Sequence, residues 1–231
     1  MSKVHHFYIT KELKEMLGTP IRKKNDIFKI LLEISSFLII NEKPVDRGFG
    51  EFIVKVDKMS RVFIHLVDQG QEVKHYSFNF PFIITEESLD EQVQAITLVS
   101  KNNRIKIDSI SLAVLKGLSS IGWFSEDGEM SSSCMLDHYE ALEIVLKDLV
   151  ESPGIYIDEI WLLIKELILL EPGYLRYDFD QKHANGRLHP LHHLDINYTN
   201  HISFKIGLES GYLKEHFIDL LDLRTDCRYL S

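Results

Sequence analysis

Cysteine is scarce in this chain. Its 231 residues include only two cysteines, Cys134 and Cys227, which lie far apart and form no CxxC pair. A disulfide framework and a zinc site made of cysteine thiolates are therefore excluded. Two isolated thiols are typical of proteins from a reducing compartment, so we expect a cytoplasmic protein.

Long uncharged hydrophobic runs are also missing. The longest apolar stretches, residues 27–40 and 155–170, are interrupted by charged side chains. Neither offers the roughly 20 apolar residues that a membrane-spanning helix needs. The first residues do not combine a basic segment with an apolar one, as a secretory signal does. We therefore expect no membrane span and no signal peptide, and we interpret both stretches as buried helices.

Basic residues are outnumbered, and the formal net charge is −9. The deficit is concentrated in residues 81–172, which carry 6 Lys and Arg against 17 Asp and Glu. Broad binding to nucleic acids depends on basic side chains that neutralise phosphates, so the composition shows no strong nucleic-acid signature. The acidic middle favours another protein as the partner and is compatible with an oligomer.

Short motifs of several common functional sites are absent too. The sequence holds no GxGxxG, no GxxxxGK[ST], no HExxH and no EF-hand loop. It therefore carries no signature of the usual nucleotide-binding, zinc-peptidase or calcium-binding sites. These absences leave open whether the protein is an enzyme.

Hydrophobic periodicity predicts an α+β fold. Asn25 or Asp26 can cap a helix, and apolar side chains then recur at helical spacing up to residue 40. Three strand-like runs follow, separated by short turns, at residues 51–56, 61–67 and 73–80. Their spacing predicts an N-terminal antiparallel meander with flanking helices.

The second half of the chain is predicted to be helical first and then to form strands. Helices are expected at residues 87–100, 108–119, 135–151 and 158–170, with Pro153-Gly154 as a separator. A closing helix is expected near residues 213–223. The last two of the four helices form a pair that we expect to pack with a C-terminal three-stranded antiparallel sheet.

The polar segment 125–133 is rich in Ser, Gly and acidic residues and is predicted to be a loop. We expect one domain over residues 1–231, in which this loop joins two lobes, residues 1–124 and 134–231.

Residues 174–208 hold the pattern that bears most on function. Polar and apolar side chains alternate there in three short runs, as in strands with one buried face. If the strands are neighbours, they share a polar sheet face that carries Arg176, Asp178, Asp180, His193, Asp195, Asn197 and Lys205. His192 falls among the apolar positions of the other face. Five of the eleven histidines lie between residues 183 and 201, which is an unusual concentration.

This polar face offers the side chains that bind divalent metals or transfer protons. His193 and Asp195 are two residues apart on one strand, which is the local half of a two-histidine, one-carboxylate site. His189, held extended by Pro190, completes a predicted metal set of His189, His193 and Asp195. Arg176 and Lys205 suit a phosphate or carboxylate of a substrate. The catalytic candidates are Asp178, His193, Asp195 and Lys205, and the binding candidates are Arg176, Asp180 and Asn197.

Two functions are compatible with this face. The first is a non-catalytic binding or assembly protein, in which Asp178–Lys205 and Asp195–Arg176 are plain cross-strand ion pairs of a solvated surface. It is preferred because such clusters are often structural. The alternative is a metal-dependent phosphodiesterase or nuclease with ligands from the same face. A non-haem iron oxygenase lacks its distal histidine here, and a PD-(D/E)XK nuclease lacks its D/E-x-K step.

Two motifs of this segment occur in the order of a known family. They are Arg176-Tyr177-Asp178-x-Asp180 and His189-Pro190-x-His192-His193-Leu194, followed by an apolar helix. In these motifs the last quarter of the chain resembles a bacterial family catalogued only as a domain of unknown function (number 2290). The chain departs from that pattern at Asp195-Ile196-Asn197-Tyr198 and in its tail. The family has no established activity, so the resemblance implies a prokaryotic source and spatial proximity of the two motifs, and no residue roles.

Overall fold

A computed structural model describes residues 3–41, 44–90, 93–124, 135–150, 153–199 and 204–226. Among the described residues, 36% lie in helices and 31% in strands, and the sheets are mostly antiparallel, which confirms the predicted α+β class. The chain divides into two units. One comprises Met1–Arg22, Lys43–Phe80 and Pro172–Ser231, and the other comprises Lys23–Glu42 and Pro81–Glu171. These units follow other boundaries than the predicted lobes 1–124 and 134–231, and the predicted loop 125–133 lies outside the described residues.

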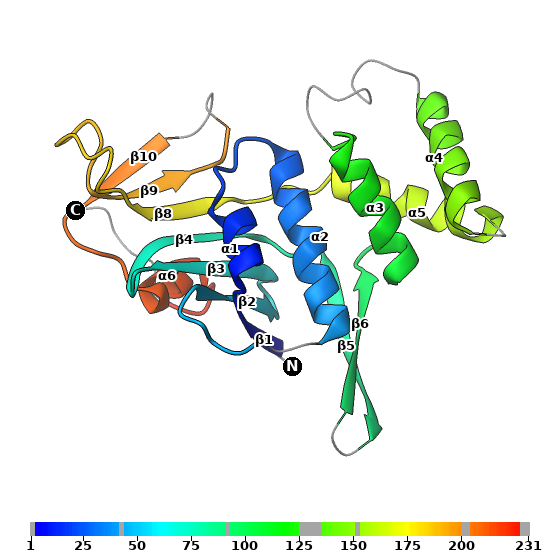
Figure 1. The fold of residues 1–231 in the computed structure, drawn as a ribbon, viewed down its shortest axis with the longest axis horizontal. Coiled ribbons are helices and arrows are strands. Elements are labelled where there is room, and N and C mark those ends of the chain that lie inside the picture. The colour runs from blue at the N-terminus through cyan, green and yellow to red at the C-terminus, as the bar shows by residue number, and fades with distance from the viewer. Residues whose placement is uncertain are drawn as a thin grey trace. The chain divides into compact units, whose positions relative to one another are not determined.

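The first unit is built on a seven-stranded sheet with the order β1-β2-β3-β4-β8-β9-β10 (Figure 1). The strands are β1 (Lys3–Tyr8), β2 (Gly50–Val56), β3 (Arg61–Asp68), β4 (Gln71–Asn79), β8 (Leu175–Phe179), β9 (His192–Ile196) and β10 (Phe204–Leu208). Strands β2, β3 and β4 pair antiparallel in sequence order, with Phe52 opposite Ile64 and Ile64 opposite Tyr76. The predicted meander is therefore confirmed.

The three C-terminal strands continue this sheet. Strand β8 pairs with β4, so that Lys74 lies opposite Asp178 and Tyr76 lies opposite Arg176. The prediction of a separate three-stranded sheet is wrong in this respect. The reason is that a strand edge has unpaired N–H and C=O groups, and β4 finds its partner in a strand far away in the sequence. Hydrophobic periodicity does not report such pairings.

Two helices lie on opposite faces of this sheet (Figure 1). Helix α1 (Lys11–Gly18) begins at Thr10, whose hydroxyl oxygen accepts a hydrogen bond from the Leu13 backbone N–H at 3.2 Å. The Tyr76 hydroxyl donates to the carbonyl of Leu17 at 3.0 Å, which places α1 on the Tyr76 face. Since Tyr76 pairs with Arg176, the polar residues of β8 share that face.

Helix α6 (Lys214–Leu221) covers the opposite face. Its Phe217 is fully buried in an apolar cluster of strand residues, which comprises Met59, Phe63, Leu175, Tyr177 and Leu194. Phe179, Ile196, Ile206 and Leu208 pack against the same cluster. The predicted apolar face of β8, β9 and β10 is thus confirmed.

The second unit contains a hairpin where a helix was predicted. Strands β5 (Phe82–Asp90) and β6 (Val93–Ser100) pair antiparallel, with Ile84 opposite Leu98. The predicted helix at residues 87–100 is therefore wrong. Ile96 and Leu98 are buried two residues apart, which is the strand period. β-Branched residues in this stretch outweigh the acidic residues that suggested a helix start.

The helices of the second unit agree with prediction. They are α2 (Lys24–Ile40), α3 (Ser109–Ser120), α4 (Met135–Leu149) and α5 (Pro153–Ile168), and the short strand β7 (Lys106–Ile107) pairs with β6. Asn25 of α2 donates from Nδ2 to the Ser119 carbonyl at 2.9 Å, which ties α2 to α3. Pro153-Gly154, predicted as a separator, opens α5, because proline is tolerated in the first turn. None of the described helices is long and apolar enough to cross a membrane.

Candidate functional site

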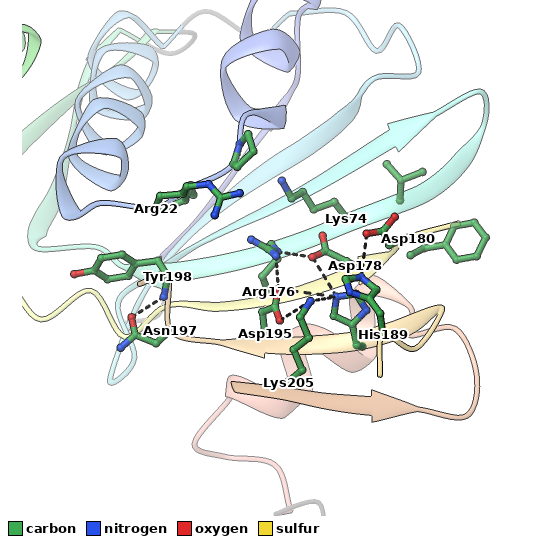
Figure 2. A pocket seen from close by; sticks show the side chains of 15 residues that line it. Arg22, Lys74, Arg176, Asp178, Asp180, His189, Asp195, Asn197, Tyr198 and Lys205 are labelled. Atoms are coloured by element: carbon green, nitrogen blue, oxygen red, sulfur yellow. Dashed lines mark hydrogen bonds and ion pairs between the residues drawn. The ribbon is translucent and has the colours of Figure 1, made fainter. Parts of the chain in front are cut away.

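A pocket of about 530 Å³ lies over the polar face of β8, β9 and β10 (Figure 2). Residues 20–22, which follow α1, and Val73 and Lys74 of β4 complete its wall. His193 and Asp195 line this pocket although they are only 1% and 4% exposed. The predicted polar face is therefore concave and partly buried, whereas a plain solvated surface would leave these two side chains open to water.

The register of the strands brings the predicted polar residues together. Asp178 lies opposite His193, and Arg176 lies opposite Asp195. On the other side of β9, Lys205 also lies opposite Asp195. Side chains directly opposite each other in antiparallel strands have Cβ atoms only about 4.5–5.5 Å apart. The five side chains therefore form one contiguous group, as predicted from their alternation.

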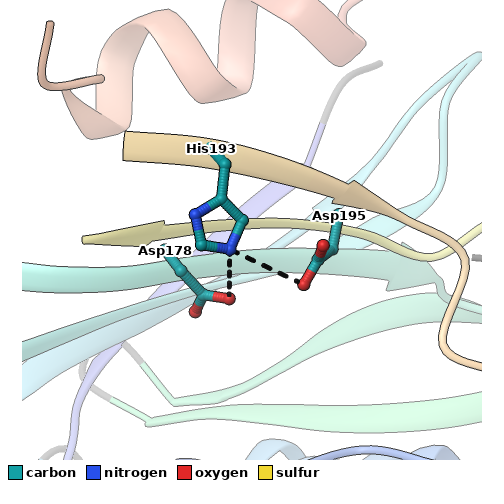
Figure 3. Close-up of side chains that lie close together, drawn as sticks. All are labelled: Asp178, His193 and Asp195. Carbon is teal, nitrogen blue, oxygen red and sulfur yellow. Dashed lines mark ion pairs between the residues drawn. The ribbon is translucent and has the colours of Figure 1, made fainter. Parts of the chain in front are cut away.

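Three of these side chains converge on one point (Figure 3). Nε2 of His193 lies 3.7 Å from Oδ2 of Asp178 and 3.9 Å from Oδ2 of Asp195. One ligand atom from each residue lies within 4.8 Å of the other two. Bond lengths of about 2.0–2.6 Å to a divalent ion leave its ligand atoms roughly 3–5 Å apart. Asp178, His193 and Asp195 can therefore hold a metal ion.

The imidazole of His193 is oriented for such a role. Its Nδ1 donates a hydrogen bond to the carbonyl of Pro190 at 2.9 Å, because a carbonyl oxygen only accepts. The lone pair of the neutral ring is then on Nε2, which faces the carboxylates. Burial lowers the pKa of His193 and outweighs the opposite effects of Pro190 and the carboxylates. The ring is thus neutral near pH 7, which is the form that binds metals or accepts a proton.

Two cations neutralise the carboxylates in the metal-free arrangement. Nε of Arg176 lies 2.5 Å from Oδ2 of Asp178, and its Nη2 binds Oδ2 of Asp195. Burial alone would lower the pKa of Arg176, but Tyr174 and the two aspartates raise it above its ordinary range. Nζ of Lys205 lies 3.3 Å from Oδ1 of Asp195. A metal ion therefore has to compete with positive charges already present.

The predicted pairing of Asp195 with Arg176 is confirmed, whereas Lys205 pairs with Asp195 and not with Asp178. Oδ1 of Asp195 is buried and accepts no hydrogen bond from the described residues. That oxygen has an ion-pair neighbour in Lys205 but retains capacity for another ligand.

His189 does not occupy the predicted place in the metal set. Its Nε2 lies 3.1 Å from Oδ2 of Asp180, and its ring centre lies 4.7 Å from that of His193. Asp180 in turn accepts a hydrogen bond from the His183 backbone N–H at 3.0 Å. In the converging group, Asp178 takes the position that was predicted for His189. His189 and Asp180 form a separate pair at the rim of the same pocket.

The remaining predicted residues are also placed. Asn197 lines the pocket just beyond β9, in a left-handed backbone conformation with φ 69°. Its Oδ1 accepts a hydrogen bond from the Tyr198 backbone N–H at 2.6 Å, so its side chain closes a turn. His192 lies on the opposite face, where its Nδ1 is 2.8 Å from the Tyr177 hydroxyl. The predicted orientation of His192 is confirmed.

Lys74 and Arg22 line the pocket but were missed by sequence reasoning. A signal for Lys74 was present. In the predicted strand 73–80, Lys74 shares one face with Tyr76 and Phe78, both of which are fully buried. A lysine at the end of an otherwise apolar face marks the border between core and site. Arg22 follows α1 and lies outside helices and strands. No sequence pattern therefore predicts that it lines the pocket.

Comparisons with known proteins add no further information. No protein-family model matches the chain, and neither a curated protein nor a solved structure matches it. The resemblance of the last quarter to family number 2290 stays a prediction.

Proposed function

We propose that the pocket is the catalytic site of a metal-dependent phosphodiesterase. The observation that carries the proposal is the convergence of Asp178, His193 and Asp195 in a pocket whose lining also includes four cations, Arg22, Lys74, Arg176 and Lys205. Two carboxylates and one neutral imidazole suit Mg²⁺, Mn²⁺ or a related divalent ion. Arg and Lys side chains suit the negative charge of a phosphate group.

In this proposal the metal-free ion pairs are a resting state. Asp178, His193 and Asp195 would hold a divalent ion, and the two carboxylates would then no longer need the charges of Arg176 and Lys205. The guanidinium and ammonium groups then become available to the phosphate of the substrate. Such an ion would supply a bound water of lowered pKa as the nucleophile for the phosphorus of the ester. We assign to Lys205, whose Nζ lies near Asp195 and His193, the role of giving a proton to the leaving oxygen.

The alternative is a non-catalytic assembly protein that uses this face against another protein. A partner-facing residue has to be accessible, and His193 and Asp195 are almost completely buried. Partner contacts would therefore fall on the rim of the pocket and leave the converging group without a role. For this reason we prefer the hydrolase.

The test measures Mn²⁺ binding by calorimetry and Mn²⁺-dependent hydrolysis of bis(p-nitrophenyl) phosphate. Asp178→Asn and His193→Gln should each weaken Mn²⁺ binding at least tenfold and abolish hydrolysis. His189→Gln is the matched control, because His189 lines the same pocket outside the converging group. Absence of both Mn²⁺ binding and hydrolysis in the wild-type protein would contradict the proposal. Loss of a binding partner in the folded His193→Gln variant would then support the assembly role.

A further inference from the structure

Lys74 is a partly buried cation without an acidic partner among the described residues. Its Nζ lies 3.4 Å from the carbonyl of Gly18 and 5.8 Å from the centre of the Tyr76 ring. Burial lowers the pKa of Lys74, and the nearby aspartates only partly offset this effect. Lys74 lines the pocket and has no carboxylate at ion-pair distance among the described residues, so its ammonium group is available to an anionic ligand. Its position therefore calls for an anion from outside the chain.

The other cations of the site differ from Lys74 in this respect. Arg176 and Lys205 both contact Asp195, and Arg176 contacts Asp178 as well. Their charges are matched within the protein. Lys74 lies opposite Asp178 in the strand register, yet it forms no ion pair with that residue in the described structure. Among the described residues, Lys74 is thus the lysine of this pocket that forms no ion pair.

Arg22 extends into the same space. Figure 2 shows Arg22 and Lys74 on the side of the pocket across from Asp195 and Lys205. The pocket is lined by four cations, Arg22, Lys74, Arg176 and Lys205, and by three carboxylates, those of Asp178, Asp180 and Asp195. Its lining is therefore net positive in a chain whose formal net charge is −9. Such a local excess attracts anions.

The size of the pocket limits the ligand. A volume of about 530 Å³ falls within the range of about 300–1,000 Å³ that is usual for small-molecule sites. A long nucleic acid requires an extended basic surface, because its affinity comes from many phosphate contacts. The acidic composition of the chain does not favour such a surface.

We propose that Lys74, together with Arg22, forms an anion subsite for a phosphate group, and that the substrate is a small phosphorylated molecule and not a polynucleotide. This inference deepens the proposed function and rests on it for the identity of the reaction. The phosphate lies between the Lys74 wall and the group of Asp178, His193 and Asp195. The subsite would orient the phosphate ester towards the metal ligands. It is formed by Lys74 and Arg22, and not by the metal ligands themselves.

The first experiment measures inorganic phosphate binding to EDTA-treated, full-length protein by thermal shift and calorimetry, with sodium chloride at matched ionic strength as reference. Phosphate should stabilise the wild-type protein, and Lys74→Met should weaken phosphate binding at least tenfold. Lys58→Met is the matched control, since Lys58 is exposed in a turn of the same unit. Equal phosphate binding by Lys74→Met and wild type, or no binding by wild type, overturns the inference.

The Lys74→Met variant should still fold, for a physical reason. Lys74 forms no ion pair with the described residues, so its removal breaks none, and methionine keeps most of the side-chain volume. In the absence of phosphate, Lys74→Met should therefore melt at the same temperature as the wild-type protein or higher. Circular dichroism confirms that the variant is folded before binding is measured.

A second experiment tests the size of the ligand. A mononucleotide and a single-stranded 20-nucleotide DNA are compared as competitors of phosphate binding at equal phosphate concentration. The mononucleotide should compete at least tenfold better than the DNA. Equal competition by the DNA overturns the inference that the substrate is a small phosphorylated molecule. Both experiments are done without metal, so a negative result in them contradicts the anion subsite and not the proposed reaction. Absence of Mn²⁺-dependent hydrolysis, in contrast, contradicts only the proposed reaction.

Discussion

Nζ of Lys205 lies 3.1 Å from Nε2 of His193. This nitrogen is also the one that faces Asp178 and Asp195 (Figure 3). A metal ion bound by His193 therefore needs the lone pair to which Lys205 now donates. Lys205 is therefore a cation that competes with a metal ion for the candidate metal site. For this reason, one substitution at position 205 should change Mn²⁺ affinity and hydrolysis in opposite directions.

Lys205→Met should therefore raise Mn²⁺ affinity and lower hydrolysis. The substitution removes a positive charge near the ion and frees the lone pair of His193, so we expect roughly tenfold tighter binding, equivalent to about 1.4 kcal/mol. Hydrolysis should fall because a phosphate contact and a proton donor are lost. Calorimetry and the phosphodiester assay measure the two effects. Lys182→Met, at an exposed position, is the control, and unchanged or weaker Mn²⁺ binding by Lys205→Met would contradict the competition.

Arg176→Met should make folding depend on a divalent ion. The guanidinium group bridges Asp178 and Asp195, so its removal leaves two neighbouring carboxylates without that charge. Breaking such a partly buried pair should lower the free energy of unfolding by roughly 2–4 kcal/mol in EDTA. Mn²⁺ should restore most of this loss, because it supplies the missing charge. Urea unfolding with and without Mn²⁺ measures it, and equal destabilisation in both conditions argues against a shared ion position.

Gly207→Ala should impair the metal site through Pro190. A Cβ atom at position 207 would lie 2.9 Å from Cγ of Pro190, whose carbonyl orients the His193 ring. We expect a loss of stability of about 1–3 kcal/mol from overpacking, together with weaker Mn²⁺ binding. Gly211→Ala is the control, since its Cβ would meet His192 Cε1 at an ordinary 3.6 Å. Normal Mn²⁺ affinity in Gly207→Ala would show that the Pro190 contact does not position His193.

A buried histidine pair on the opposite face should make the protein sensitive to acid. Nδ1 of His65 lies 3.1 Å from Nδ1 of His75, and both side chains are buried. Burial lowers the pKa of His75 from 6.5 to about 4 and that of His65 to about 2. Below pH 6.5 the unfolded chain therefore binds protons that the native protein does not bind. The free energy of unfolding is therefore highest above pH 6.5, and it decreases as the pH falls towards 4.

For His75, the free energy of unfolding should decrease by on the order of 3 kcal/mol between pH 7 and 4. Urea unfolding across this range measures it. In His75→Phe, the free energy of unfolding should depend less on pH. This variant should also be less stable at pH 7, because His65 Nδ1 loses its partner. An unchanged pH dependence in this variant would assign the acid sensitivity to other groups.

The sequence by itself determined which face most of the site residues occupy. Side chains alternate across a strand because of local backbone geometry, so Arg176, Asp178, His193, Asp195 and Lys205 had to share a face once their segments were strands. The opposite orientation of His192 follows from the same rule. The helix at Lys24–Ile40 was equally predictable, since its apolar spacing is local.

Only the tertiary structure decided which residues of different segments meet. Residues 87–100 carry acidic side chains that suit a helix start, yet pairing in the hairpin β5–β6 made them strands. Asp178, and not His189, completes the converging group because Asp178 lies directly opposite His193 in the register. Lys74 enters the site because β8 pairs with β4. Alternation is a property of each strand alone, whereas the choice of partner strand depends on packing between segments distant in the sequence.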